Sequence, residues 1–125
     1  MQQSLKIPIV IPRVKIEGPK TFREIDMILD TGAVYTMISW DIAKDIGYDP
    51  AGSRKRTSIV TANGIIEVPL LKVKKIIVKD IAVKNVEVIC HNIPEVVGIE
   101  GLLGLSFLKE FRTLIDYRKK ILEII

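Results

Sequence analysis

The sequence has little of several residue types on which common classes of protein depend. Its 125 residues include one cysteine, Cys90, and one histidine, His91. A disulfide framework, a cysteine-based zinc finger and a site built from several histidines are therefore excluded within one chain. Eight glycines and six prolines are too few for a collagen-like or disordered chain. A single cysteine also fits a reducing compartment, so we expect a cytoplasmic protein.

Long apolar stretches are missing as well. No run approaches the roughly 18–20 residues of a membrane span. Residues 1–8 lack the basic start and the unbroken apolar core of a signal peptide. We therefore expect no contact with a membrane.

Aromatic residues are few, which bears on nucleic-acid binding. The chain has three Phe, three Tyr and one Trp, with a modest net charge of +4. Its basic clusters, residues 54–56 and Lys72, Lys74 and Lys75, have no aromatic residues between them on which bases could stack. Solvated strand faces explain these clusters better than phosphate contacts. We expect no nucleic-acid partner.

The chain is rich in β-branched residues. It has 22 Ile and 12 Val in a sequence that is 48% hydrophobic, and such residues favour strands. The length fits one domain over residues 1–125. Abundant Lys with few Asn and Gln is typical of thermophiles.

Alternating or continuous apolar segments predict many short strands and two short helices. Pro8 and Pro12 restrict the first strand to a sheet edge or a kinked conformation. Ser39 is suited to cap the first helix, and Gly47 to end it. The pattern predicts an all-β fold, closed or sandwiched. The expected strands are 5–15, 21–29, 34–38, 57–61, 65–71, 72–78, 81–89, 99–103, 113–115 and 121–125, and the expected helices are 40–46 and 106–111.

The segment with the most chemical information is Asp30-Thr31-Gly32-Ala33. An Asp directly after a buried strand loses hydration at a cost unless it is hydrogen-bonded or functional. Thr31 offers a hydroxyl, and Gly32 lets the backbone turn tightly. Taken alone, the motif also fits an ordinary turn in which the Asp caps its own loop.

Two further segments give this motif a context. Asn63-Gly64, preceded by Ala62, is a strong hairpin signal because both residues tolerate positive φ. Leu102-Leu103-Gly104 comes just before a predicted short helix. With these three features in this order, the chain resembles the retropepsin-like aspartic proteases, the single-domain relatives of retroviral protease, over residues 7–125.

The resemblance implies a retropepsin-like acid protease β-barrel with a flap hairpin and one or two short helices. It implies an aspartic endopeptidase in which Asp30 is catalytic and a homodimer supplies a second Asp30. The chain has one such motif, so activity requires two copies, related by a twofold axis. A water activated between the two carboxylates would cleave a peptide or protein substrate, with no metal and no cofactor.

The resemblance also assigns roles to neighbouring residues. Thr31 would bond across the dimer axis, Gly32 would face the substrate backbone, and Ala33 would complete the active-site loop. The flap would close over an extended peptide and exclude water; its residues are Ala62, Asn63, Gly64 and Ile65. The second loop of the site would be formed by Leu102, Leu103 and Gly104.

The chain departs from the retroviral pattern at Val34 and Leu105. Retroviral enzymes commonly carry an Asp and an Arg at these positions, and the two pair; here a hydrophobic contact would replace the ion pair. The apolar segment 121–125 would be an uncovered edge strand, and we expect it to be buried at the dimer interface. A fold does not guarantee its usual function. A non-catalytic peptide-binding or dimerisation module is therefore the alternative.

Four other residues have plainer interpretations. Cys90 has no activating neighbour in the sequence, so we expect a small hydrophobic residue at a strand end. His91 is expected to be a solvent-exposed loop residue. Asp26 would share a strand face with Asp30, where solvation is favoured over a carboxylate metal pair. Trp40 is expected to pack in the core or at an interface.

Overall fold

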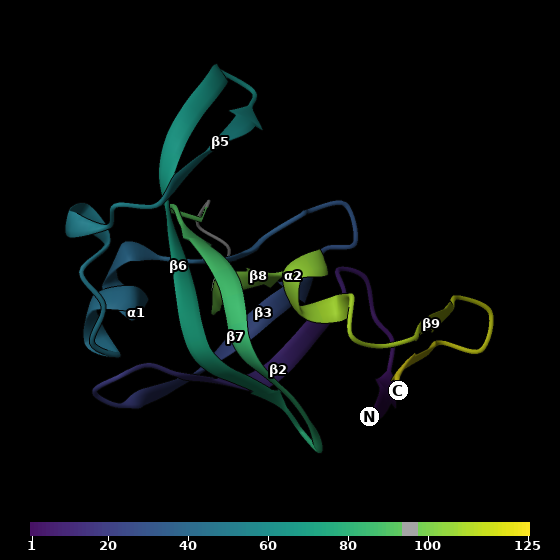
Figure 1. Cartoon of the computed structure of the whole chain (residues 1–125). Coiled ribbons are helices and arrows are strands. Elements are labelled where there is room, and N and C mark those ends of the chain that lie inside the picture. Colours follow the sequence, from purple (N-terminus) through teal and green to yellow (C-terminus); the bar gives the residue numbers. More distant parts are fainter. Residues whose placement is uncertain (94–97) are drawn as a thin grey trace.

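A closed β-barrel forms the body of the molecule in the computed structural model, which describes residues 1–93 and 98–125. Among these residues, six strands pair in a ring, because β2 bonds to β3 on one side and to β6 on the other (Figure 1). The expected all-β fold is confirmed. In ring order the strands are β2 (Val10–Glu17), β3 (Phe22–Leu29), β8 (Ile99–Leu103), β4 (Thr36–Ile38), β7 (Ile81–Cys90) and β6 (Gly64–Val78).

The first barrel strand is kinked where the sequence has Pro12. The register of β2 against β3 shifts between Ile11 and Val14, and Arg13 has a positive φ of 51°. The Arg13 N–H turns away from the strand pairing and donates to Asp26 Oδ1 at 2.9 Å. The predicted kink is confirmed, but the strand begins at Val10 rather than at residue 5.

A hairpin projects from the barrel, as the Asn63-Gly64 signal predicted (Figure 1). It pairs β5 (Arg56–Thr61) with the first part of β6, and β5 takes no other strand partner in the described chain. The turn residues are Ala62 and Asn63, and Gly64, with φ +114°, is the residue that needs a glycine. Asn63, which also tolerates a positive φ, does not adopt one here.

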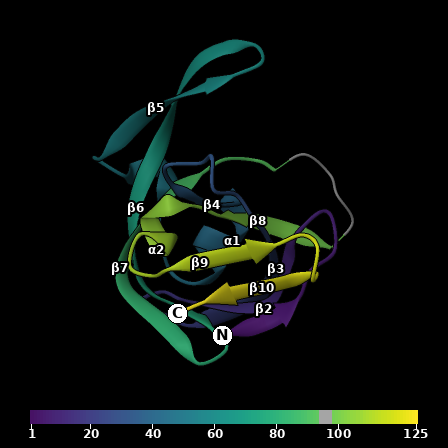
Figure 2. The same ribbon diagram turned by 90° about the vertical axis from the view of Figure 1, so that its right-hand side faces the viewer.

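The two chain ends form a second, three-stranded sheet beside the barrel (Figure 2). Its order is β1 (Gln2–Ser4), β10 (Ile121–Ile124) and β9 (Thr113–Asp116). The last strand was expected to be an uncovered edge, and that premise is wrong because β10 pairs on both sides. Its side chains Leu122 and Ile124 are fully buried in the chain's own core.

The helices are short and lie outside the ring of barrel strands. Ser39 caps α1 (Trp40–Asp45), its Oγ accepting from Ile42 N at 3.2 Å as predicted, and Trp40 packs against the main core. A 3-10 turn, η1 (Pro50–Gly52), lies in a stretch expected to be irregular. The last helix, α2 (Leu105–Leu108), starts one residue earlier than predicted and ends earlier. No helix in the described residues is long and apolar enough to cross a membrane.

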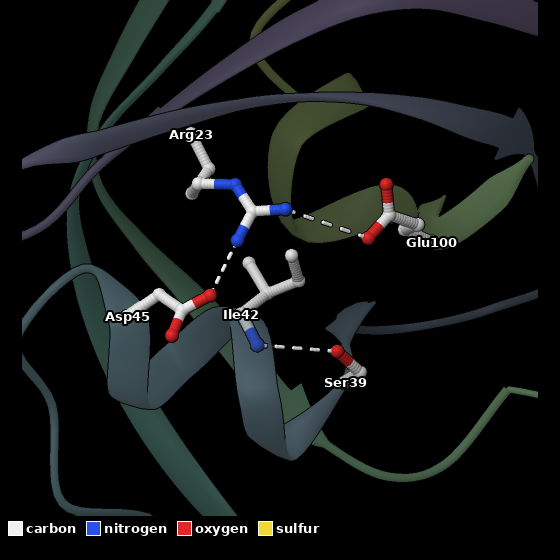
Figure 3. A network of polar contacts seen from close by, with 5 residues as sticks. All are labelled: Arg23, Ser39, Ile42, Asp45 and Glu100. Carbon is white, nitrogen blue, oxygen red and sulfur yellow. Dashed lines mark hydrogen bonds and ion pairs between the residues drawn. The ribbon is translucent and has the colours of Figure 1, made fainter.

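A charged network ties α1 to the barrel wall (Figure 3). Arg23 on β3 pairs with Asp45 on α1 and, at 3.8 Å, with Glu100 on β8. All three side chains are more than a third exposed, so we expect each pair to contribute at most about 1 kcal/mol. The core, not this network, holds the fold together.

Candidate active site

The site is built where two neighbouring parallel strands end. Leu29, the last residue of β3, lies opposite Leu103, the last residue of β8. Because parallel strands end at the same edge of the sheet, the Asp30 loop and the turn into α2 leave the barrel side by side. The Asp30 N–H donates to the Leu103 carbonyl at 3.0 Å. The structure therefore brings together the two segments that the sequence singled out separately.

The carboxylate of Asp30 is held by its own loop. Its Oδ1 accepts from Gly32 N at 3.0 Å, and Ala33 N donates to the Asp30 carbonyl at 3.3 Å. Asp30 is half-buried, whereas Thr31 and Gly32 are exposed. The loop thus fixes the orientation of the carboxyl group while leaving the adjacent hydroxyl and glycine accessible to another molecule.

A cleft of about 670 Å³ opens in front of Asp30. The Asp30 loop forms one wall, and Ser58, Ile59 and Val60 of β5 form another. Met37, Ile89 and Leu102 line the remainder. Met37 and Ile89 belong to a small apolar cluster that is separate from the main core, and Ile59 and Leu102 pack against it. Within the described lining, Asp30 is the one charged side chain, so it faces an apolar groove.

Of the predicted flap and second-loop residues, only some line the cleft. The tip residues, Ala62 to Ile65, are exposed and do not line this cleft; the strand leading to them does. Leu102 lines the cleft, but Leu103 is fully buried in the main core. The second loop therefore presents one side chain to the cleft and uses the next to anchor itself.

Gly104 packs directly against the end of the Asp30 loop. A Cβ atom there would lie 2.5 Å from the Tyr35 carbonyl oxygen and 2.8 Å from that of Ala33. Backbone atoms at these distances cannot move aside cheaply, so only glycine fits this close approach. The predicted importance of Gly104 has a steric cause, and its φ of −105° is ordinary.

Two hydroxyl residues near the site escaped the sequence argument. Thr36 is fully buried, and its Oγ1 accepts from Gly104 N at 3.1 Å and from Ser106 Oγ at 3.0 Å. Ser106 Oγ in turn accepts from Thr36 N at 2.8 Å. The available signal was the threonine within the mostly apolar run 34–38, because a buried strand tolerates a threonine hydroxyl only when it has hydrogen-bond partners.

The apolar pair Val34 and Leu105 lies beside this contact. Leu105 N donates to the Ala33 carbonyl at 2.8 Å, and Ser106 N donates to the Val34 carbonyl at 2.9 Å. The side chains remain on the surface, with 64% of Val34 and 39% of Leu105 exposed. The two positions that the retroviral pattern would fill with an ion pair are therefore neighbours here and are uncovered in the single chain.

The remaining candidates stay outside the site. Cys90 is fully buried, and burial raises the pKa of its thiol to about 12, so it is no nucleophile at neutral pH. His91 is half-buried rather than solvent-exposed, and its main-chain N–H donates to the Ile38 carbonyl at 3.1 Å. Asp26 accepts the Arg13 N–H. In residues 1–93 and 98–125, no group of three or more His, Cys, Asp or Glu is placed to hold a metal ion.

Comparison with known proteins gives the family and the fold of the chain. Residues 13–110 match the family described as "gag-polyprotein putative aspartyl protease". The chain belongs to this family of retropepsin-like aspartyl proteases. Its structure is similar to a crystal structure of a retropepsin-like aspartic protease from Rickettsia conorii, with a TM-score of 0.71 and 20% sequence identity over 100% of this chain and 97% of that one. No curated protein matches the sequence.

Proposed function

We propose that the protein is an aspartic endopeptidase that acts as a homodimer, with Asp30 as its catalytic residue. The observation that carries this proposal is the position of Asp30: a carboxyl group of fixed orientation at the mouth of an apolar cleft. Membership of an aspartyl protease family supports the same chemistry. One chain supplies half of the catalytic pair, so a second copy completes the site.

The surface around Asp30 is suited to such a copy. Thr31 and Gly32 are exposed beside the carboxyl group, and Val34 and Leu105 add apolar area next to them. A twofold axis near Thr31 would bring the two Asp30 carboxylates together and pair equivalent surfaces. Contact between the exposed Thr31 hydroxyls of the two copies would hold the loops at a fixed spacing.

Two carboxylates about 3 Å apart cannot both ionise, so the pair shares one proton. The ionised member takes a proton from a bound water, and that water attacks the carbonyl carbon of the peptide bond. The protonated member donates to the carbonyl oxygen. The resulting tetrahedral intermediate collapses when its C–N bond breaks. The carboxyl group that took the proton from water passes it to the amine nitrogen, and a hydroxyl proton of the intermediate returns to the other carboxylate. Protonation belongs to the pair as a unit, not to either Asp30 alone.

The cleft favours an extended peptide as the substrate. In the described chain the outer edge of β5 has no strand partner, so a peptide main chain can pair with it. Side chains pointing into the cleft would meet Val34, Met37 and Ile89, which are apolar. We therefore expect cleavage next to large aliphatic or aromatic residues.

The test is cleavage of denatured casein from pH 3 to pH 8 by wild type, Asp30→Asn and Asp26→Asn. Asp26 lies on β3, four residues before Asp30, and Asn there keeps an acceptor for Arg13 N, so it is the matched control. We expect cleavage on the acid side of neutrality that is lost in Asp30→Asn and kept in Asp26→Asn. If a folded dimeric wild type cleaves nothing that depends on Asp30, the protein is instead a peptide-binding module.

A further inference from the structure

Thr36 stands out because it is a polar residue in the core. It is fully buried, and it is the one polar or charged residue of the buried set in the described chain. Burying a hydroxyl among apolar residues is unfavourable unless it is hydrogen-bonded. Thr36 meets this condition through Gly104 and Ser106, which are 68 and 70 residues away in the sequence. The Thr36 hydroxyl thus accepts two hydrogen bonds from a segment that is distant in the sequence.

The hydroxyls of Thr36 and Ser106 accept main-chain hydrogen bonds where the pairing of β4 with β8 ends. β4 pairs with β8 at Met37–Leu102 and at Ile38–Gly101, and the chain then turns into α2. Beyond these pairs, the N–H groups of Thr36 and Gly104 need other acceptors. Ser106 Oγ accepts the first at 2.8 Å, and Thr36 Oγ1 accepts the second at 3.1 Å. Two side chains thus continue the join between the strands up to the edge of the site.

The Asp30 loop is held at both ends by this arrangement. At one end, Asp30 N bonds to the Leu103 carbonyl at 3.0 Å. At the other, Thr36 and Ser106 bond to each other, with the helix N–H groups of residues 105 and 106 bonded to the carbonyls of residues 33 and 34. The loop from 30 to 36 is therefore hydrogen-bonded at both ends to the end of β8 and the start of α2.

We propose that Thr36 and Ser106 are positioning residues that fix where Asp30 meets the Asp30 of a second copy. The proposal rests on the proposed aspartic protease function. Neither residue lines the cleft, so neither is placed to touch the substrate. A displacement of the loop in one chain is repeated in its partner by symmetry, which doubles its effect on the carboxylate spacing. Misplacement on the order of 1 Å can cost about 100-fold in rate.

The test compares Thr36→Val, which keeps the shape of the side chain and removes the hydroxyl, with Thr36→Ser, which keeps the hydroxyl. Ser106→Ala removes the other partner. Thr113→Val, a half-buried threonine of β9, is the control for the same chemical change away from the site. Ile76→Val, in the fully buried core, is the control for a loss of stability alone. Each variant is measured for kcat, KM, the pH profile of kcat, dimer content and hydrogen exchange at the Gly104 amide.

We expect Thr36→Val and Ser106→Ala to lower kcat about 10- to 100-fold while KM changes less than about twofold. The pH profile should shift because the spacing of the carboxylate pair changes, and in Thr36→Val exchange at Gly104 should accelerate. Thr36→Ser and both controls should stay close to wild type in all of these. Thr36→Val with wild-type kcat and pH profile would overturn the positioning role alone. A wild type without Asp30-dependent cleavage would overturn the proposed function and this role with it.

Discussion

The main-chain N–H of Asp30 donates to the carbonyl of Leu103 at 3.0 Å, across the ends of two parallel strands. This bond makes the position of the candidate catalytic residue a property of the barrel rather than of a free loop. Leu103 is fully buried, so the acceptor cannot move without disturbing the core. In the proposed dimer the two halves of the catalytic pair would come from separate chains, and a rigid scaffold of this kind would hold each half in place.

The close approach of Gly104 to the loop gives the first prediction. Gly104→Ala would place a methyl group 2.5 Å from the Tyr35 carbonyl oxygen, and overpacking against backbone is typically destabilising by about 1–3 kcal/mol. We expect the free energy of unfolding to fall by about 2 kcal/mol, measured by urea denaturation with Trp40 fluorescence as the signal. Gly32→Ala is the control, since its nearest neighbour would be Asp30 Oδ1 at 3.4 Å. Equal losses in the two variants would contradict the steric explanation.

Much of the site could be predicted from the sequence because its signals are local. The Asp30-Thr31-Gly32 turn and the hairpin turn of residues 62–64 each lie within a few residues and follow from backbone preferences. The short apolar strands were also found, since their β-branched residues alternate or run together. Local patterns of this kind predict where a strand or turn lies in the sequence, but not which strands pair with one another.

Features that depend on distant pairing could not be predicted in the same way. The strand β1 consists of Gln2, Gln3 and Ser4, which carry no apolar pattern, and it exists because it pairs with residues 121–123. The same pairing is why the last strand is not an edge. Thr36 and Ser106 meet across 70 residues of sequence, and nothing local at either position signals the other.

The buried thiol of Cys90 gives the second prediction. Burial raises its pKa to about 12 in the folded protein, against 9.0 for an unburied thiol. The unfolded chain therefore loses this proton at lower pH than the folded chain does, and folding must keep the thiol protonated. The contribution of Cys90 to stability is thus fully present below pH 9 and is lost as the pH rises from 9 towards 12.

The measurement is the free energy of unfolding of wild type and Cys90→Ala at several values between pH 7 and pH 10.5. Alanine cannot ionise, so the difference between the two proteins isolates the thiol. We expect that difference to be constant up to about pH 8 and then to change, in favour of the alanine variant, by up to about 1.4 kcal/mol per pH unit. A difference that stays constant through pH 10.5 would show that the folded thiol ionises as freely as the unfolded one.

The exposed apolar side chain of Val34 gives the last prediction, which concerns assembly. In the single chain 64% of Val34 is exposed beside Leu105, so replacing it should leave the monomer fold intact. In the proposed dimer the same side chain lies next to the paired Asp30 loops. Val34→Asp would remove apolar contact area there and add one negative charge per copy beside two carboxylates.

We expect Val34→Asp to weaken the dimer by at least about tenfold in Kd, measured by sedimentation, without lowering the melting temperature of the isolated monomer. The matched control is Phe22→Asp, because Phe22 is 47% exposed and lies at the opposite end of β3 from Asp30.

The wild-type dimer should also keep its Kd, or bind more tightly, between about 0.05 and 0.5 M salt, since an apolar contact is not screened as an ion pair is. A wild-type dimer that weakens with salt and tolerates Val34→Asp would mean that charged residues elsewhere hold the two copies together. The exposed side chains of Val34 and Leu105 would then contact the substrate rather than the second copy, because Val34 also lines the cleft.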